Sequence, residues 1–348
     1  RRQRQMCIRD RKVRHEVLSI HPERKTVSVR NLETGEEFEE HYDKLLLSPG
    51  ARPVQPEIPG VGLENLFTLR TVEDTMRIKA YIETHQPKSV VLAGGGFIGL
   101  ELAENLRESG MDVTIVQRAK QLMNPFDPDM ASFIHSEMRR HGVTLALGHT
   151  VEGFVEKEGG IDVLLKGEDP IHADMGILAI GVAPDAKLAG EAGIKLGIKG
   201  SIVVNERMET SIPDIYAVGD AVQIKNAVSG EEDLISLAGP ANKQGRIAAD
   251  NICGGNSSYS GAQGSSVIKV FDMTAATTGL NEKRAKKLGI DTDKVILSPM
   301  SHAGYYPGGK VMTMKVLFEK ETNRLLGAQV VGYEGCLLYT SDAADELD

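Results

Sequence analysis

The sequence predicts an α/β protein built from more than one domain. Its 348 residues give room for two or three domains, each large enough to bury its own core. Segments in which apolar and polar residues alternate are interspersed with segments of helical period. A glycine pattern, Gly94-x-Gly96-x-x-Gly99, lies between an apolar run and an amphipathic segment. Together these observations indicate strands and helices that alternate along the chain.

The composition excludes several classes of protein. Hydrophobic residues make up 41% of the chain and charged residues 26%, which is ordinary for a soluble globular protein. No apolar run approaches the roughly 18–20 residues of a membrane span, and no signal peptide is readable. The balance of 40 basic against 49 acidic residues argues against nucleic acid as the main partner. Three scattered cysteines predict neither a disulfide framework nor a metal site, so we expect a cytoplasmic protein.

The two ends of the chain predict an origin in cloning or sequencing DNA. The start, RRQRQMCIRD, could be a basic nucleic-acid-binding arm, and the end, CLLYTSDAADELD, an acidic tail. However, possible codings of the two are reverse complements over nearly their whole length, and this DNA resembles a transposase adapter used in sequencing libraries. We therefore expect residues 1–11 and 336–348 to be translated adapter, and the chain to be a fragment truncated at both ends.

The first two thirds of the chain predict short strands followed by a block in which strands and helices alternate. Residues 13–47 predict strands with a turn at Thr34-Gly35, and the prolines at 53, 56 and 59 indicate a domain crossing. Thr71 with Asp74 is typical of a capping box that opens a helix through residue 82. Next come a strand, a glycine turn, a helix and a second strand over residues 89–117, then a helix starting at Asp127, and strands at 161–165 and 175–180.

The last third predicts a further mixed block. Short strands are expected at residues 202–204 and 215–218, followed by a helix entered at Pro240 and closed by Gly254-Gly255. After a flexible stretch we expect a strand at 267–271, a helix at 282–288, and strands at 312–318 and 325–331.

The glycine pattern at residues 94–99 predicts a dinucleotide-binding loop. Gly94 permits the tight turn, Gly96 lets the backbone approach a pyrophosphate at the helix N-terminus, and Gly99 allows close packing of helix and strand. The second strand should end in an acidic residue that binds the ribose hydroxyl, but here it ends in Gln117, followed by Arg118 and Lys120. A neutral amide beside two cations tolerates a 2′-phosphate, so the choice between NADH and NADPH stays open.

Four stretches together resemble the pyridine nucleotide-disulfide oxidoreductase family. They are LLLSPGARP (45–53), GGGFIGLE (94–101), LAIGVAPD (178–185) and TSIPDIYAVGDAV (210–222). The resemblance implies two Rossmann-like domains that bind FAD and NAD(P)H, and a C-terminal α+β dimerisation domain. The implied division is FAD domain 12–67 and 186–260, NAD(P)-binding domain 68–185, and an incomplete dimerisation domain 261–335.

The resemblance also implies roles for individual residues. Asp220 would bind the flavin ribityl chain, Phe97 would gate the nicotinamide pocket, and Glu101 would point toward the flavin. The full set implied for FAD is Ser48, Pro49, Gly50, Ala51, Gly219, Asp220, Leu237 and Ala238. The set implied for NAD(P)H is Gly94, Gly95, Gly96, Phe97, Ile98, Glu101, Gln117, Arg118 and Gly181. For Glu101 an exposed helical glutamate without function is the alternative, and for Asp220 a turn or cap residue.

Three further stretches narrow the resemblance within the family. LAGPANKQGRIAADNI (237–252), KVFDMTAATTGLNEK (269–283) and HAGYYPGG (302–309) are similar to coenzyme A-disulfide reductases and NADH-dependent persulfide or polysulfide reductases. In that group C-terminal tyrosines serve the thiol site of the partner subunit in a homodimer, which implies Tyr305 or Tyr306 here; a packed aromatic pair is the alternative. The single redox cysteine would lie before residue 11, so we expect no disulfide reduction by the fragment itself.

Other functions remain open on the same residues. An NADH oxidase or peroxidase shares the scaffold and the redox cysteine, and a monomeric ferredoxin-type reductase is disfavoured by the chain after residue 264. A catalytically inactive nucleotide-binding module or redox sensor is the alternative of another class. Flavin content and hydride transfer to a dye would separate any enzyme from such a module.

Overall fold

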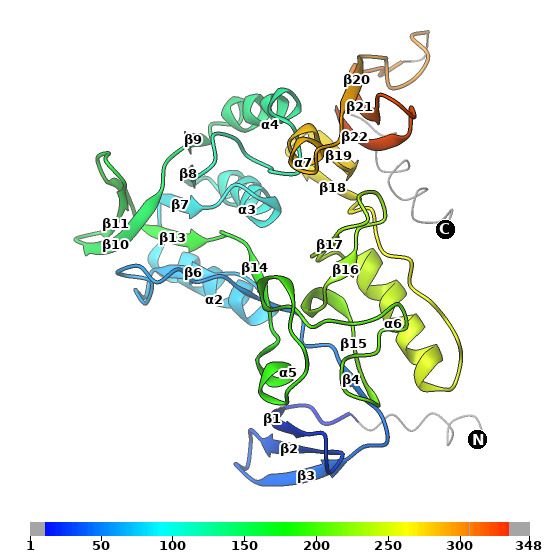
Figure 1. Cartoon of the computed structure of the whole chain (residues 1–348). Helices are drawn as coiled ribbons and strands as arrows, with labels where there is room; N and C mark the ends of the chain where they lie inside the picture. The colour runs from blue at the N-terminus through cyan, green and yellow to red at the C-terminus, as the bar shows by residue number, and fades with distance from the viewer. Residues whose placement is uncertain (1–10, 306, 334–348) are drawn as a thin grey trace. The chain divides into compact units, whose positions relative to one another are not determined.

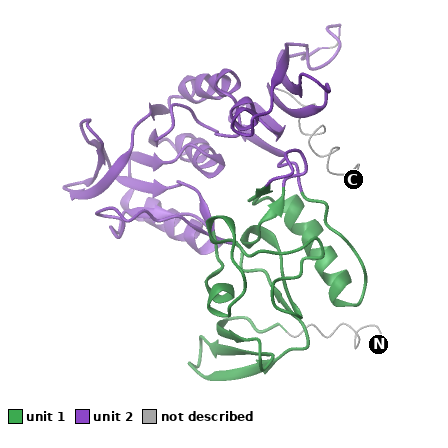
Figure 2. Cartoon of the chain, in the orientation of Figure 1, with its two compact units in different colours: residues 1–50, 184–225, 232–261 green, residues 51–183, 226–231, 262–348 purple. Residues whose placement is uncertain are grey.

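A computed structural model describes residues 11–305 and 307–333 of the chain. These residues form two compact units (Figure 2), the first made of residues up to 50, 184–225 and 232–261, the second of residues 51–183, 226–231 and 262 onward. Of the predicted adapter segments 1–11 and 336–348, all residues except Arg11 lie outside the described residues, as do Cys7, Tyr306 and Cys336. Among the described helices, none is both long and apolar enough to cross a membrane.

The first unit contains three small sheets and a long helix (Figure 1). Its antiparallel sheet has the order β1-β2-β3, and the predicted turn at Gly35 joins its last two strands with a φ of 76°. Its elements are β1 (His15–His21), β2 (Thr26–Asn31), β3 (Glu37–His41), β4 (Leu45–Leu47), α5 (Lys187–Glu191), η1 (Ile198–Gly200), β15 (Ile215–Ala217), η2 (Gly219–Ala221), β16 (Ile224–Lys225), β17 (Glu232–Asp233) and α6 (Ala238–Ile252).

The centre of the second unit is a five-stranded parallel sheet of order β6-β13-β7-β8-β9. The strands of this sheet and the helices next to it are β6 (Leu66–Thr68), α2 (Val72–His85), β7 (Ser89–Ala93), α3 (Phe97–Glu108), β8 (Asp112–Gln117), α4 (Pro128–Arg140), β9 (Thr144–Leu147) and β13 (Met175–Leu178). A separate two-stranded sheet is formed by β5 (Ala51–Pro53) and β14 (Val182–Pro184). The predicted capping box at the start of α2 is present, because Thr71 Oγ1 accepts from Asp74 N–H and the Asp74 carboxylate accepts from Thr71 N–H.

The central sheet is covered on both faces, which explains why its strands are almost wholly apolar. In β7, Val90 and Leu92 point into a core shared with α3, α4 and the C-terminal sheet, while Val91 and Ala93 point the other way. That second face is covered by an antiparallel sheet of β10 (Val151–Lys157), β11 (Gly160–Leu165) and β12 (Ile171–Ala173).

The C-terminal part of the second unit is a five-stranded sheet of order β18-β19-β22-β21-β20, with β20 at an edge. Its elements are β18 (Ser266–Val270), β19 (Met273–Gly279), α7 (Glu282–Lys287), β20 (Thr292–Leu297), β21 (Met312–Glu319) and β22 (Leu325–Gly332). It shares one hydrophobic core with α3 and α4, to which it contributes Phe271, Met273 and Val331. Burial of this shared surface binds the C-terminal sheet to the parallel sheet and its helices.

The structure differs from the sequence-based expectation at a few elements. Residues 202–204 form no strand, since Ile202 makes only isolated bridges with Leu196 and Val222. The helix expected from Pro240 begins two residues earlier, with Pro240 in its first turn, where the missing N–H costs nothing. Strands β19 and β20 were not predicted, because MTAATTG contains only one large apolar residue, Met273, and β20 is exposed at the sheet edge.

Candidate functional site

The loop between β7 and α3 is a tight turn that leaves one side open. Gly94 has a φ of 119°, and a Cβ there would lie 2.2 Å from the Ala179 carbonyl oxygen. A Cβ at Gly99 would lie 2.1 Å from the Gly94 carbonyl oxygen. By contrast, a Cβ at Gly96 would meet nothing within 4 Å. Gly96 is also the N-cap of α3, so the open side exposes the positive end of a 12-residue helix.

The end of β8 meets this loop through Gln117. The Gly95 N–H donates to Gln117 Oε1 at 3.2 Å, so the amide oxygen helps to hold the loop and the amide nitrogen is left as a donor. Arg118 and Lys120 follow on the surface, and neither has a carboxylate partner among the residues that the structure describes. The structure therefore brings together the predicted Gly95 and Gln117, with two cations next to them in sequence.

The remaining residues predicted for NAD(P)H lie on the same unit. Ile98 and the half-buried Phe97 are in the first turn of α3, and Phe97 packs against the shared core. Glu101 is exposed one turn further along the same helix. Gly181 is exposed after β13, with a φ of 113°, and its carbonyl accepts from Val54 N–H at 2.9 Å. The roles of gate and flavin contact stay predictions.

A segment that the sequence analysis did not single out, residues 119–126, lies against the glycine loop. The Met123 N–H donates to the Gly95 carbonyl at 2.8 Å. A Cβ on Gly95 would lie 2.3 Å from Leu122 Cδ2, so the leucine methyl covers this glycine directly. Both Leu122 and Met123 are fully buried. In the sequence, the contact could have been inferred from the apolar pair Leu122-Met123, which follows soon after a strand that ends in polar residues.

A cavity of about 840 Å³ lies between the 119–126 segment and α7. Its three acidic residues pair with lysines outside the lining: Asp127 with Lys315, Glu282 with Lys315 and Lys294, and Asp291 with Lys320. The lysines that line the cavity have no ion-pair partner in the described part of the chain; they are Lys120, Lys283 and Lys286. The lining therefore contains three lysines without an ion pair and three carboxylates that are already paired.

In the first unit, two parallel strands bring the predicted FAD residues together. β4 and β15 pair in register, and the Val218 N–H donates to the Leu47 carbonyl at 3.0 Å. Because parallel strands end at the same edge, Ser48 to Gly50 and the Gly219-Asp220 turn lie next to each other. Ala51 continues this chain as the first residue of β5, and Leu237 and Ala238 form the N-cap and first residue of α6.

Gln244 is a residue of this turn that the sequence analysis missed. Its Oε1 accepts from the Gly219 N–H at 2.7 Å, and the side chain is buried, with 1% exposed. Gly219 has a φ of 81°, which explains the glycine. Gln244, Ala248 and Asn251 form the buried stripe of α6. A glutamine at a helical spacing from a buried alanine is the sequence feature that could have indicated this contact.

The C-terminal sheet presents an exposed apolar edge. Val295, Ile296 and Leu297 of β20 have exposed fractions of 43%, 49% and 51%. Tyr305, in the loop between β20 and β21, is 90% exposed. An edge strand with apolar side chains on both faces is a surface suited to pairing with another chain.

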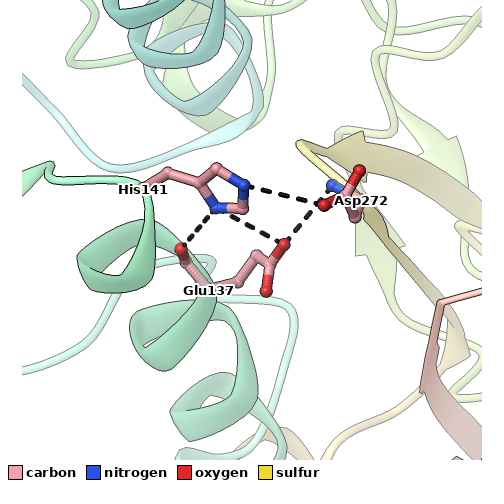
Figure 3. A group of neighbouring side chains, drawn as sticks. All are labelled: Glu137, His141 and Asp272. Atoms are coloured by element: carbon pink, nitrogen blue, oxygen red, sulfur yellow. Dashed lines mark hydrogen bonds and ion pairs between the residues drawn. The ribbon is translucent and has the colours of Figure 1, made fainter.

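Two clusters of acidic and basic side chains join α4 to the C-terminal sheet. In the first, the buried Glu137 carboxylate accepts from Arg140 and from Tyr333, each at 3.0 Å. It also accepts from the Asp272 N–H at 3.3 Å (Figure 3). His141 stacks on Phe271 with ring centroids 4.0 Å apart. Burial and then the bond to Glu137 raise the pKa of Tyr333.

In the second cluster, Lys315 is the centre. Its Nζ, 1% exposed, lies 3.0 Å from Asp127 and 2.8 Å from Asp129, and it also pairs with Glu282. Both clusters therefore already hold a side-chain cation, Arg140 in one and Lys315 in the other. Their acidic groups hold two parts of the second unit together.

Two family profiles match the chain. The profile described as pyridine nucleotide-disulphide oxidoreductase matches residues 7–245, and the one for the dimerisation domain of these proteins matches residues 265–341.

Curated relatives with similar sequences have related names. An NADH oxidase of Methanocaldococcus jannaschii is 39% identical over 86% of this chain and 66% of its own length. A CoA-dependent NAD(P)H sulfur oxidoreductase of Pyrococcus abyssi is 36% identical over 91% of this chain and 70% of its own. A coenzyme A disulfide reductase of Staphylococcus aureus is 34% identical over 93% of this chain and 72% of its own.

A solved structure has the same fold. The reduced CoADR-RHD of Bacillus anthracis is similar with a TM-score of 0.91 and 46% identity, covering 95% of this chain and 60% of that one. The chain thus spans 60% to 72% of the length of the proteins compared.

Proposed function

Because this chain belongs to the pyridine nucleotide-disulphide oxidoreductase family, we propose that its protein is an FAD-dependent enzyme that oxidises NAD(P)H. The proposed acceptor is coenzyme A disulfide, or a persulfide or polysulfide carried on coenzyme A. The observation that carries the nucleotide part of the proposal is the open side at Gly96, at the N-terminus of α3. The names of the S. aureus and P. abyssi relatives support the acceptor.

We assign NAD(P)H to the loop between β7 and α3. The free N–H groups of the first turn of α3 and its dipole favour a pyrophosphate, and Gly96 leaves the space for the backbone to approach it. FAD is assigned to the turn at Gly219-Asp220, where Asp220 would accept from a ribityl hydroxyl and Gln244 holds the turn. The proposed domains are 12–67 with 186–260 for FAD, 68–185 for NAD(P)H and 261–335 for dimerisation.

When bound, the flavin supplies hydride and electron chemistry that no side chain of the protein can perform. The contribution of the protein is binding, orientation and exclusion of water. Phe97 would cover the nicotinamide pocket and Glu101 would face the flavin side of it. Cys253 is not proposed as a redox residue, because it lies at the C-cap of α6, where the helix dipole does not favour a thiolate.

Arg118 and Lys120 support the use of NADPH as well as NADH. Both are exposed cations without a carboxylate partner in the described residues, so a 2′-phosphate could pair with them without displacing an existing ion pair. Gln117 presents no negative charge that would repel such a phosphate. Dual use of the two dinucleotides is the proposal that fits these three side chains.

The proposed assembly is a cytoplasmic homodimer formed through the C-terminal sheet. The match to the dimerisation domain and the apolar β20 edge support it. In this assembly Tyr305 or Tyr306 would reach the thiol site of the partner subunit, and the 90% exposure of Tyr305 is compatible with such a contact. Sedimentation of the purified protein tests the dimer, with a monomer at micromolar concentration as the opposing result.

The acceptor is tested by assaying the product of the complete gene. With NADPH or NADH as donor, we expect faster turnover with coenzyme A disulfide or coenzyme A persulfide than with molecular oxygen. Faster reduction of oxygen would favour the second candidate, an NADH oxidase, which the M. jannaschii relative supports. A colourless protein without affinity for either dinucleotide would contradict both and favour an inactive module.

A further inference from the structure

His135 contacts the segment that covers the dinucleotide loop. It lies in the second half of α4 and is half-buried. The backbone N–H of Leu122 donates to His135 Nε2 at 3.0 Å. A ring nitrogen that accepts from an N–H must be unprotonated, so this contact requires a neutral imidazole with its proton on Nδ1.

Leu122 transmits this contact to the glycine loop. Its side chain covers Gly95, and the next residue, Met123, donates its N–H to the Gly95 carbonyl. Met123 has a φ of 51°, a left-handed conformation that is unfavourable for methionine and is maintained by surrounding contacts. The bond to His135 is one of those contacts, so it helps to fix the position of Gly95.

Few charges act on His135. Burial first, and then the Arg139 guanidinium one turn along the same helix, lower its pKa. The facing segment contributes the uncharged Leu122, Met123 and Phe126, and its one charged residue, Lys120, is exposed. Of the elements packed on α4, the strands β9, β19 and β22 carry no charged residue. Strand β18 carries Lys269, which pairs with Glu104. Among the described residues, no carboxylate has a resolved effect on the pKa of His135, so the ring has no counter-ion that would stabilise its protonated form.

We infer that His135 is a positioning residue for the dinucleotide loop, and that its protonation weakens the binding of NAD(P)H. The inference rests on the proposed assignment of the dinucleotide to this loop. In the protonated ring Nε2–H points at the Leu122 N–H, and two donors in contact repel each other. The Leu122–Met123 brace then moves away from Gly95 and the loop loses its binding geometry.

The direction of the pH dependence follows from linkage. The dinucleotide binds to the form with neutral His135, so the complex holds fewer protons than the free protein. Affinity is therefore highest above the pKa of His135 in the free protein and falls as the pH drops through it. One proton limits the loss to about tenfold per pH unit, and we expect a several-fold increase in Kd between pH 7.5 and pH 5.5.

The test is a calorimetric titration with NAD⁺, whose charge is constant over this pH range, on the wild type and three variants. In His135→Gln the amide oxygen accepts from the Leu122 N–H without titrating, so we expect wild-type affinity at pH 7.5 and no loss at pH 5.5. In His135→Leu we expect weak affinity at both pH values. His141→Gln, on the same helix but away from the 119–126 segment, should keep the wild-type pH profile.

The outcomes separate this inference from the proposed function. A wild type that binds NAD⁺ equally well at both pH values, or a His135→Gln variant that keeps the wild-type loss, overturns the inference and leaves the nucleotide site standing. Absence of binding at every pH overturns the nucleotide assignment itself. If the variants fail to fold, amide exchange of the Leu122 N–H in the wild type decides: it should lose protection at pH 5.5, after correction for intrinsic rates, and unchanged protection contradicts the inference.

Discussion

Replacing Lys315 by methionine should destabilise the second unit strongly. Lys315 Nζ is buried on β21 among Asp127, Asp129 and Glu282. Methionine fills a similar volume without charge, so the substitution removes the ammonium with little change in packing. The buried carboxylate of Asp127, which is 2% exposed, then loses its counter-ion.

The loss of stability depends on which carboxylates stay shielded from water after the ammonium is removed. Removing one partner of a buried pair costs about 3–5 kcal/mol. Asp129 and Glu282 are partly exposed and can be rehydrated, and Asp127 keeps a bond from Gln329 at 2.7 Å. We therefore expect the lower end, about 3 kcal/mol, which corresponds to a decrease in Tm of roughly 6–12 °C for a unit of this size.

The same network predicts how stability depends on pH. Burial by itself would raise the pKa of Asp129 and Glu282, but hydrogen bonds from lysines outweigh it and lower both pKa values below the usual 3.8 and 4.5. Groups with a depressed pKa stabilise the fold above their unfolded pKa, and this stability is lost as the pH falls through the folded pKa. The wild type should therefore lose part of the Lys315 contribution below about pH 4, and Lys315→Met should show a flatter acid limb.

The assay is urea unfolding followed by circular dichroism, with Lys294→Met as matched control. Lys294 pairs with Glu282 at 2.8 Å, but both side chains are about 40% exposed, so its loss should cost less than about 1 kcal/mol. Adding Asp127→Asn to Lys315→Met removes the isolated charge and should restore part of the stability. If Lys315→Met is no less stable than Lys294→Met, the buried network contributes little and this reasoning is refuted.

Three further substitutions test the sites. Gly99→Ala places a methyl 2.1 Å from the Gly94 oxygen and should abolish NAD⁺ binding, whereas the control Gly62→Ala, in open space, should leave it unchanged. Equal Kd values for the two variants in calorimetry would contradict this. Gln244→Leu leaves the Gly219 N–H without its acceptor and should raise the Kd for FAD by about 5- to 100-fold. The control Asn242→Ala, on the same helix, should leave this Kd unchanged; titration of flavin fluorescence measures both. Arg118→Ala should raise the KM for NADPH by about tenfold or more and leave that for NADH within twofold; equal effects would exclude a 2′-phosphate contact.

The parts of the fold set by local chemistry were predictable from the sequence. The capping box at Thr71, the proline start of α4 and the alternation of β7 with α3 each depend on residues within one turn or one strand, and all three are present. Strand β20 was missed because it is an edge strand, in which both faces are exposed and no apolar period is required.

Only part of the candidate site could be predicted from the sequence. The motif predicts that Gly94 and Gly99 have no room for a side chain. In the structure a Cβ at Gly94 would clash with the Ala179 carbonyl, and one at Gly99 with the Gly94 carbonyl. Gln244 and His135 were missed, because each acts on a backbone N–H that is 13 or more residues away in sequence. Such contacts depend on how elements pack, which a periodic pattern does not encode.

The C-terminal sheet also contacts the segment that braces the glycine loop at residues 94–99. Asn281, the N-cap of α7, donates to the carbonyls of Asn124 and Pro125, at the end of the segment that braces Gly95. Two residues later, Asp127 exchanges two hydrogen bonds with Gln329 of β22, each 2.7 Å long. The brace is therefore tied at both its middle, by His135, and its end, by the C-terminal sheet. Because this sheet also shares a core with α3 and α4, a short chain of packed and hydrogen-bonded residues connects it to the glycine loop.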